Sequence, residues 1–158
     1  MTGMFRETVW WALFIPAALL VQSFVPGVDV LIAGLVILAQ EERRAALACY
    51  VLLCIVLQEG IGSQPFGASI LWYAGTLIPL LFGRGLLGGH KFLFVLLLAC
   101  LLCPLYFAIV YSLASLQELP VDTELLTARS IEQTISLPIV WLVAMCTRFR
   151  REAHVFPS

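Results

Sequence analysis

Residues 91–116 read KFLFVLLLACLLCPLYFAIVYSLASL, and after Lys91 this stretch contains no charged residue. An α-helix needs about 20 mainly apolar residues to cross the hydrocarbon core of a bilayer. The stretch is long enough to do so, and it therefore predicts a membrane-spanning helix. Pro104 lies near its middle and removes one backbone donor, so we expect the helix to be kinked or broken there.

The composition of the whole chain agrees with a membrane location. Of the 158 residues, 61% are hydrophobic and 12% are charged, whereas a soluble domain carries about 25% charged residues. The mean hydropathy is +1.00. These values predict a single integral membrane domain over residues 1–158, and the net charge of −1 gives no indication of nucleic-acid binding.

Five further apolar segments flank residues 91–116, which predicts an all-α, polytopic fold with about six transmembrane helices in one compact bundle. The segments 28–39 and 45–58 are short, so they must thin the membrane locally or pack as a protected hairpin. We expect a glycine-rich connection over 83–90 and an acidic loop over 117–129. The predicted helices are 9–25, 28–39, 45–58, 68–82, 91–116 and 130–147.

The distribution of lysine and arginine predicts the orientation. If the N-terminus lies in the cytoplasm, the predicted cytoplasmic segments hold eight of the nine basic residues, and the outer segments hold only Arg129. Such an asymmetry is the positive-inside signal. Six crossings then place both termini in the cytoplasm. The first segment lacks a small-x-small cleavage site, which favours an uncleaved anchor over a signal peptide.

Motifs that could carry catalysis are weak. The run Gly83 to Gly88 matches the dinucleotide fingerprint G-x-G-x-x-G, but that motif functions between a strand and a helix, and a loop is the better interpretation here. Cys100 and Cys103 have a redox-like spacing without a cationic neighbour, so small apolar filler is favoured. His90 and His154 have no ligand at metal-binding spacing. We therefore expect no enzyme, no cofactor and no metal site.

Two acidic residues near predicted segment ends are of interest. Asp29 opens the second segment, where a carboxylate typically caps a helix. Glu59 closes the third segment. It either emerges into water or lies paired within the bilayer, and an intramembrane ionisable group is a candidate functional residue.

Small residues in the second and fourth segments, including Ala33-Gly34 and Ala74-Gly75, allow helices to approach closely. In lipid, such contacts replace the hydrophobic effect in holding helices together. Packing within this chain is the favoured interpretation, and a partner-binding face is the alternative.

Three stretches together resemble a known family. These are Leu20-Val21-Gln22-Ser23, Pro26-Gly27-Val28-Asp29-Val30-Leu31, and Glu59 to Gly67, which has the spacing of the family's acidic-x-x-x-small-x-Pro-Leu-Gly signature. The charged turn Gln40 to Arg44 also falls where that family has a short basic turn. With the length and the six-segment layout, the chain resembles the MreD family of bacterial rod-shape-determining proteins over about residues 20–82. It departs from the family at Glu59, where aspartate is usual, and at 52–57, where the family is rich in glycine.

The resemblance implies a non-catalytic protein of the bacterial inner membrane that binds the bitopic protein MreC and belongs to the complex directing peptidoglycan synthesis during elongation. It also implies a fold similar to the S component of energy-coupling-factor transporters. On this hypothesis the candidate contact residues are Gln22, Asp29, Glu59, Gly62, Pro65, Gly67, Trp72 and Tyr73.

Two alternatives remain open at this point. One is a small-solute-binding subunit of a transporter, whose cavity would be lined by polar and aromatic residues near the outer segment ends. The other is a membrane enzyme acting on lipid-linked substrates, for which the acidic outer residues Glu118, Asp122, Glu124 and Glu132 supply no motif. The candidate lining residues of the first alternative are Gln22, Asp29, Glu59, Trp72, Tyr73 and Gln133.

Overall fold

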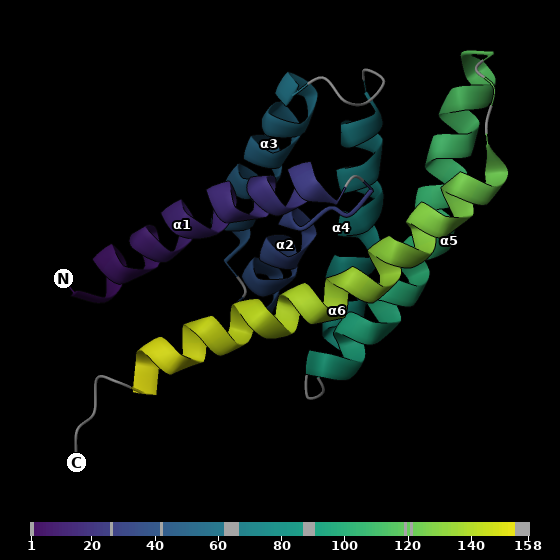
Figure 1. The fold of residues 1–158 in the computed structure, drawn as a ribbon. Coiled ribbons are helices and arrows are strands. Elements are labelled where there is room, and N and C mark those ends of the chain that lie inside the picture. Colours follow the sequence, from purple (N-terminus) through teal and green to yellow (C-terminus); the bar gives the residue numbers. More distant parts are fainter. Residues whose placement is uncertain are drawn as a thin grey trace.

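The structure is a computed structural model that describes residues 2–25, 27–41, 43–61, 67–86, 91–118, 120 and 122–153. All of the regular secondary structure in these residues is α-helical, which confirms the predicted all-α class (Figure 1). The helices are α1 (Thr2–Phe24), α2 (Leu31–Gln40), α3 (Arg44–Ile61), α4 (Ala68–Leu86), α5 (Lys91–Leu116) and α6 (Thr123–Ala153).

Three stretches of the described chain are long and apolar enough to cross a membrane: Glu7–Phe24, Lys91–Leu116 and Thr123–Arg148. Two shorter apolar helical stretches are Leu31–Gln40 and Ala68–Gly83. The chain therefore has the helices that a membrane protein requires, whereas the count of six crossings stays a prediction.

Helix α2 forms the centre of the fold. Every residue from Leu31 to Ala39 is buried, and α2 contacts α1, α3, α4 and α6. Figure 1 shows it enclosed by the longer helices. Its ten residues extend for only about 15 Å at 1.5 Å per residue. A helix that is apolar on all sides is buried in a core or a membrane, and here protein surrounds it.

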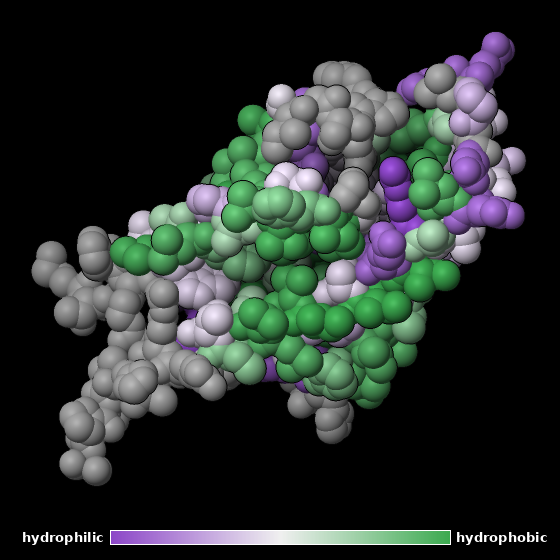
Figure 2. All heavy atoms as spheres, in the orientation of Figure 1, coloured by the Kyte–Doolittle hydropathy of each residue, from purple (hydrophilic) through white to green (hydrophobic). Residues whose placement is uncertain are grey.

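The outer helices leave large apolar side chains uncovered. Phe24, Phe82 and Ile135 are 77%, 75% and 58% exposed, and hydrophobic residues cover most of the face seen in Figure 2. Water solvates such a continuous apolar surface poorly, whereas lipid does not. The exposed faces therefore suit a hydrocarbon environment.

Two glycines permit close helix contacts. A Cβ atom at Gly34 of α2 would overlap with the hydroxyl of Tyr50 on α3 and touch the ring of Phe14 on α1. A Cβ atom at Gly83 of α4 would lie 2.7 Å from the ring of Phe94 on α5. Gly34 thus serves packing within the chain, as was expected for this small-residue pair.

The prediction that residues 117–129 form a loop was wrong for most of its length, because α6 begins at Thr123 and not at 130. Asp122 explains the early start. Its Oδ1 accepts hydrogen bonds of 3.1 Å from the backbone N–H groups of both Glu124 and Leu125, which is the interaction of an N-cap residue. With 31 residues, α6 and not α5 is the longest helix described.

Other predicted boundaries also change. Helix α5 is one continuous helix through Pro104, so of the two predicted alternatives, a kink or a break, the break does not occur. Proline is tolerated inside apolar helices where local adjustment satisfies the freed carbonyl. Helix α4 continues to Leu86, so the first residues of the expected connection 83–90 are helical, and Gly83 is retained there for the contact with Phe94.

Candidate functional site

The carboxylate of Asp29, in the loop between α1 and α2, is the centre of a polar cluster. Its Oδ1 accepts hydrogen bonds from Gln22 Nε2 at 2.8 Å and from the backbone N of Leu31 at 3.1 Å. Its Oδ2 accepts one from Trp72 Nε1 at 3.0 Å. The bond to Leu31 satisfies an amide at the start of α2, as the capping hypothesis predicted, although Val30 is the N-cap residue itself.

Gln133 of α6 completes this group, although it lies 104 residues along the chain from Asp29. Its Oε1 accepts a hydrogen bond from the backbone N of Asp29, and its Nε2 donates to the backbone O of Asp29 at 3.4 Å. Its side chain is buried, with 1% of its surface exposed. We call Gln22, Asp29, Trp72 and Gln133 the Asp29 cluster, which joins α1, α4 and α6 to the entry of α2.

Two tyrosines lie beside the Asp29 cluster. Tyr73 of α4 is completely buried, and its hydroxyl, in the neighbourhood of the Asp29 carboxylate, makes no hydrogen bond within the described part of the chain. Tyr50 of α3 donates a 3.1 Å hydrogen bond to the backbone O of Leu31. Burying a carboxylate is costly unless hydrogen bonds compensate for the lost water, and the donors of Gln22, Leu31 and Trp72 supply that compensation from α1, α2 and α4.

Glu59 lies apart from the Asp29 cluster, near the end of α3. Its Oε1 accepts a 3.1 Å hydrogen bond from the backbone N of Gly67 and so joins the end of α3 to the start of α4. Gly67 has a φ of +86°, which favours glycine. The candidate residues Gly62 and Pro65 lie outside the described residues.

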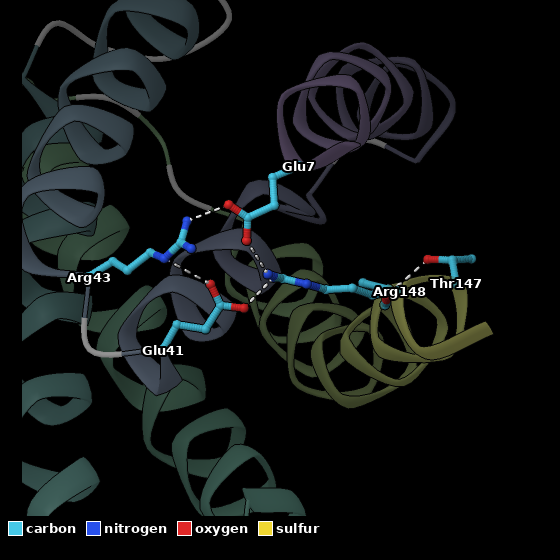
Figure 3. A network of polar contacts seen from close by, with 6 residues as sticks. Glu7, Glu41, Arg43, Thr147 and Arg148 are labelled. Carbon is cyan, nitrogen blue, oxygen red and sulfur yellow. Dashed lines mark hydrogen bonds and ion pairs between the residues drawn. The ribbon is translucent and has the colours of Figure 1, made fainter. Parts of the chain in front are cut away.

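A second polar group, at the opposite end of α2, was not predicted from the sequence (Figure 3). Glu7 of α1 pairs with Arg43 at 2.7 Å and with Arg148 of α6 at 3.2 Å. Glu41 pairs with the same two arginines, at 3.8 Å from Arg43 and in direct contact with Arg148. We call these four residues the charge ring. The ring joins the first part of α1, the α2–α3 turn and the last part of α6.

The ring is only partly shielded from solvent. The side chain of Arg148 is 19% exposed and that of Arg43 is 50% exposed. Arg148 also lies over the ring of Trp10, with its Cζ 5.7 Å from the ring centroid, a distance that allows a cation–π interaction. The hydrogen bond to Glu7, and then the charge of Glu7, raise the pKa of Arg43 above its usual range.

Neither polar group has the composition of a metal or redox centre. Among the described residues, no three or more His, Cys, Asp or Glu side chains are placed to hold a metal ion, and all five cysteines are unpaired. The geometry is that of helix-joining contacts: one buried carboxylate with its donors, and one closed set of ion pairs. Comparison of the chain with known protein families, with curated proteins and with solved structures finds no match.

Proposed function

We propose that this protein is a non-catalytic scaffold of the bacterial inner membrane that resembles MreD, binds MreC and helps control cell shape and peptidoglycan synthesis. The observation that carries the proposal is the position of the residues behind the resemblance. Gln22 and Asp29 organise the entry to the buried helix α2, and Glu59 holds the turn before α4 through Gly67. The residues on which the resemblance rests thus have structural roles, as a scaffold requires.

The proposed topology has six crossings with both termini in the cytoplasm. The charge ring supports it, because the ring brings together the start of α1, the α2–α3 turn and the end of α6. Those are segments that the positive-inside rule independently assigns to one side of the membrane. Helices α2 and α3 would cross as a hairpin whose shorter member, α2, is shielded from lipid by its neighbours.

We propose the turn at Gly67 as part of the surface that sets the position of the partner. A Cβ atom built at Gly67 would meet no other described atom within 4 Å, so a side chain there projects into open space. A partner with a single membrane helix could pack against the apolar outer faces and contact this turn at its outer end. In lipid, shape and hydrogen bonding decide such packing.

The test is co-purification of the full-length tagged protein with MreC in mild detergent. We expect recovery of MreC with the wild type and a clear loss with Gly67→Leu. Because leucine is strained at a positive φ, Gly67→Asn is the matched variant, since asparagine tolerates that conformation. If Gly67→Leu is folded and still recovers MreC fully, the proposed contact surface is wrong. If the wild type recovers no MreC, the proposed function is wrong.

One observation favours a second candidate, a solute-binding subunit of a transporter. The structure brings together Gln22, Asp29, Trp72 and Gln133, all candidate lining residues of a cavity, with Tyr73 beside them. Against it, Gln22, Trp72 and Gln133 already donate hydrogen bonds to Asp29, which leaves only the hydroxyl of Tyr73 without a partner among these described side chains. Recovery of an ATPase pair and a coupling membrane subunit in the same co-purification would support this candidate over the scaffold.

A further inference from the structure

Among the described residues from Phe92 to Thr147, Arg129 is the only basic residue. It lies near the start of α6, at the end of the molecule where α5 ends. It lies on α6, four residues before Gln133, and residues four apart share a helix face. Arg129 therefore lies on the side of α6 that meets the Asp29 cluster. Its side chain is partly buried.

The apolar stem of Arg129 packs against Gly27, in the loop between α1 and α2. A Cβ atom at Gly27 would lie 3.1 Å from Cγ, 3.3 Å from Cδ and 3.4 Å from Cβ of Arg129. Gly27 has a φ of +110°, a conformation that glycine adopts readily. The loop thus has both the shape and the missing side chain that allow the stem of Arg129 to lie against it.

The guanidinium itself has no acidic partner. Within the described part of the chain, Arg129 makes no ion pair and donates no hydrogen bond, although Glu132 lies three residues further along α6. The carboxylate of Asp29 is occupied by donors from Gln22, Trp72 and Leu31. A positioned arginine without a carboxylate has its donors available for a ligand.

Helix α5, which packs against α6, contributes a tyrosine to this region. Tyr106 of α5 is within electrostatic reach of both Arg129 and Asp29, and its ring makes an edge contact with Trp72 at 5.3 Å between centroids. The Tyr106 hydroxyl can donate a hydrogen bond to an anion. Arginine and tyrosine thus offer charge-assisted and neutral donors on α5 and α6.

The position is accessible from water. Glu124 and Thr127 of α6, which precede the predicted membrane segment 130–147, are exposed, and hydrophilic residues gather at this end of the molecule in Figure 2, at the upper right. Exposed carboxylates face water rather than hydrocarbon. An anion can therefore approach Arg129 from the aqueous side.

We infer that Arg129, whose stem packs against Gly27, binds an oxyanion, either the phosphate or carboxylate group of a solute or the phosphate of a lipid headgroup. The planar guanidinium forms paired hydrogen bonds with such groups, which a lysine cannot reproduce. This site goes beyond the scaffold function, which needs no bound anion. The two can fail separately, because one is read by anion binding and the other by recovery of MreC.

The test uses the purified full-length protein in maltoside detergent, which contains no phosphate. Thermal unfolding is followed while inorganic phosphate, acetate or dihexanoylphosphatidylglycerol is titrated against chloride at constant ionic strength, since a ligand of the folded state raises the unfolding midpoint. Stabilisation by phosphate or acetate identifies a solute site. Stabilisation by the lipid alone identifies a headgroup site. No stabilisation by any of the three overturns the inference.

Variants connect the stabilisation to Arg129. Arg129→Met keeps the stem against Gly27 and is expected to weaken binding about tenfold or more, as is typical when a hydrogen-bonded charge is removed. Arg129→Lys keeps the charge without the fork and should fall between. Arg44→Met removes an exposed arginine in the α2–α3 region and should bind as the wild type does. If Arg129→Met binds as well as the wild type, the inference fails; if Arg129→Met does not fold, Arg129→Lys and Tyr106→Phe decide in the same way.

Discussion

The Asp29 cluster and the charge ring lie at opposite ends of α2 and join the same three helices, α1, α2 and α6, by different chemistry. The Asp29 cluster holds one carboxylate with neutral donors, and Trp72 and Gln133 in it are 7% and 1% exposed. The charge ring holds two acids and two arginines with side chains 19–50% exposed. Neutral donors form hydrogen bonds with the Asp29 carboxylate, which water cannot reach. Oppositely charged side chains pair in the charge ring, which water can reach.

The distance between the two groups explains why they use different chemistry. Helix α2 spans about 15 Å, and the hydrocarbon core is about 30 Å thick. In a bilayer of ordinary thickness the two groups cannot both lie at headgroup level. If the charge ring lies at the inner surface, either the membrane is thinned around the short helix α2 or the Asp29 cluster lies below the outer headgroups; in both cases its buried polar groups need protein partners.

The largest expected effect follows from Asp29→Ala. The substitution leaves the buried donors of Gln22, Trp72 and Leu31 without an acceptor, and each unpaired buried donor costs about 1–3 kcal/mol. We expect the free energy of unfolding to fall by about 3 kcal/mol or more, measured by SDS titration in mixed micelles. Asp29→Asn, which keeps one acceptor oxygen, should lose less. Equal losses in the two variants would show that the hydrogen bonds do not matter.

Arg148→Met should have the next largest effect. It removes the ion pairs with Glu7 and Glu41 and the contact with Trp10, while it keeps the apolar stem. We expect a loss of about 2 kcal/mol, less than for a fully buried pair because water can partly replace the arginine. A loss larger than that of Asp29→Ala in the same titration would reverse the order argued above.

Arg43→Met is the matched variant within the ring and should have a smaller effect. Its side chain is 50% exposed, and exposed ion pairs contribute about 0.2–1 kcal/mol. We expect a loss of about 0.5 kcal/mol in the same assay. If Arg43→Met and Arg148→Met are equally destabilised, then burial does not rank the two arginines.

The smallest expected effect is that of salt, which should change the stability contributed by the charge ring but not that contributed by the Asp29 cluster. Salt screens exposed charges over a Debye length of about 10 Å at 0.1 M. Raising the salt concentration should therefore reduce the stability difference between wild type and Arg43→Met by a few tenths of a kcal/mol. The penalty of Asp29→Ala should stay unchanged. A salt-dependent Asp29→Ala penalty would indicate that solvent reaches the cluster.

The helical class could be predicted from the apolar runs, and residues 91–116 became α5 with the same bounds. The start of α6 was missed because a hydropathy pattern does not detect caps. Asp122, followed by Thr123 and Glu124, is a helix-start signal that could have corrected the boundary. The central place of α2 could not be predicted, because an apolar helix that faces lipid and one that faces protein have similar sequences.

The Asp29 cluster and the charge ring show a second limit of prediction from the sequence. Gln22, Asp29, Trp72 and Gln133 were singled out one by one, but pairings over 104 residues leave no local pattern in a sequence. Glu7 was missed because orientation is argued from lysine and arginine alone. Its position on the side predicted to hold most of the arginines was an available signal for an ion pair.

The burial of α2 constrains the order in which the helices can pack together during synthesis of the chain. α2 precedes α6 along the chain, with three helices between them, yet α2 contacts α6 and the backbone N–H of Asp29 donates a hydrogen bond to Gln133 of α6. Until α6 has entered the membrane, one side of α2 faces lipid, water or another protein. The core around α2 therefore closes only once α6 has been synthesised, and a chain that stops after α5 would leave one side of α2 uncovered.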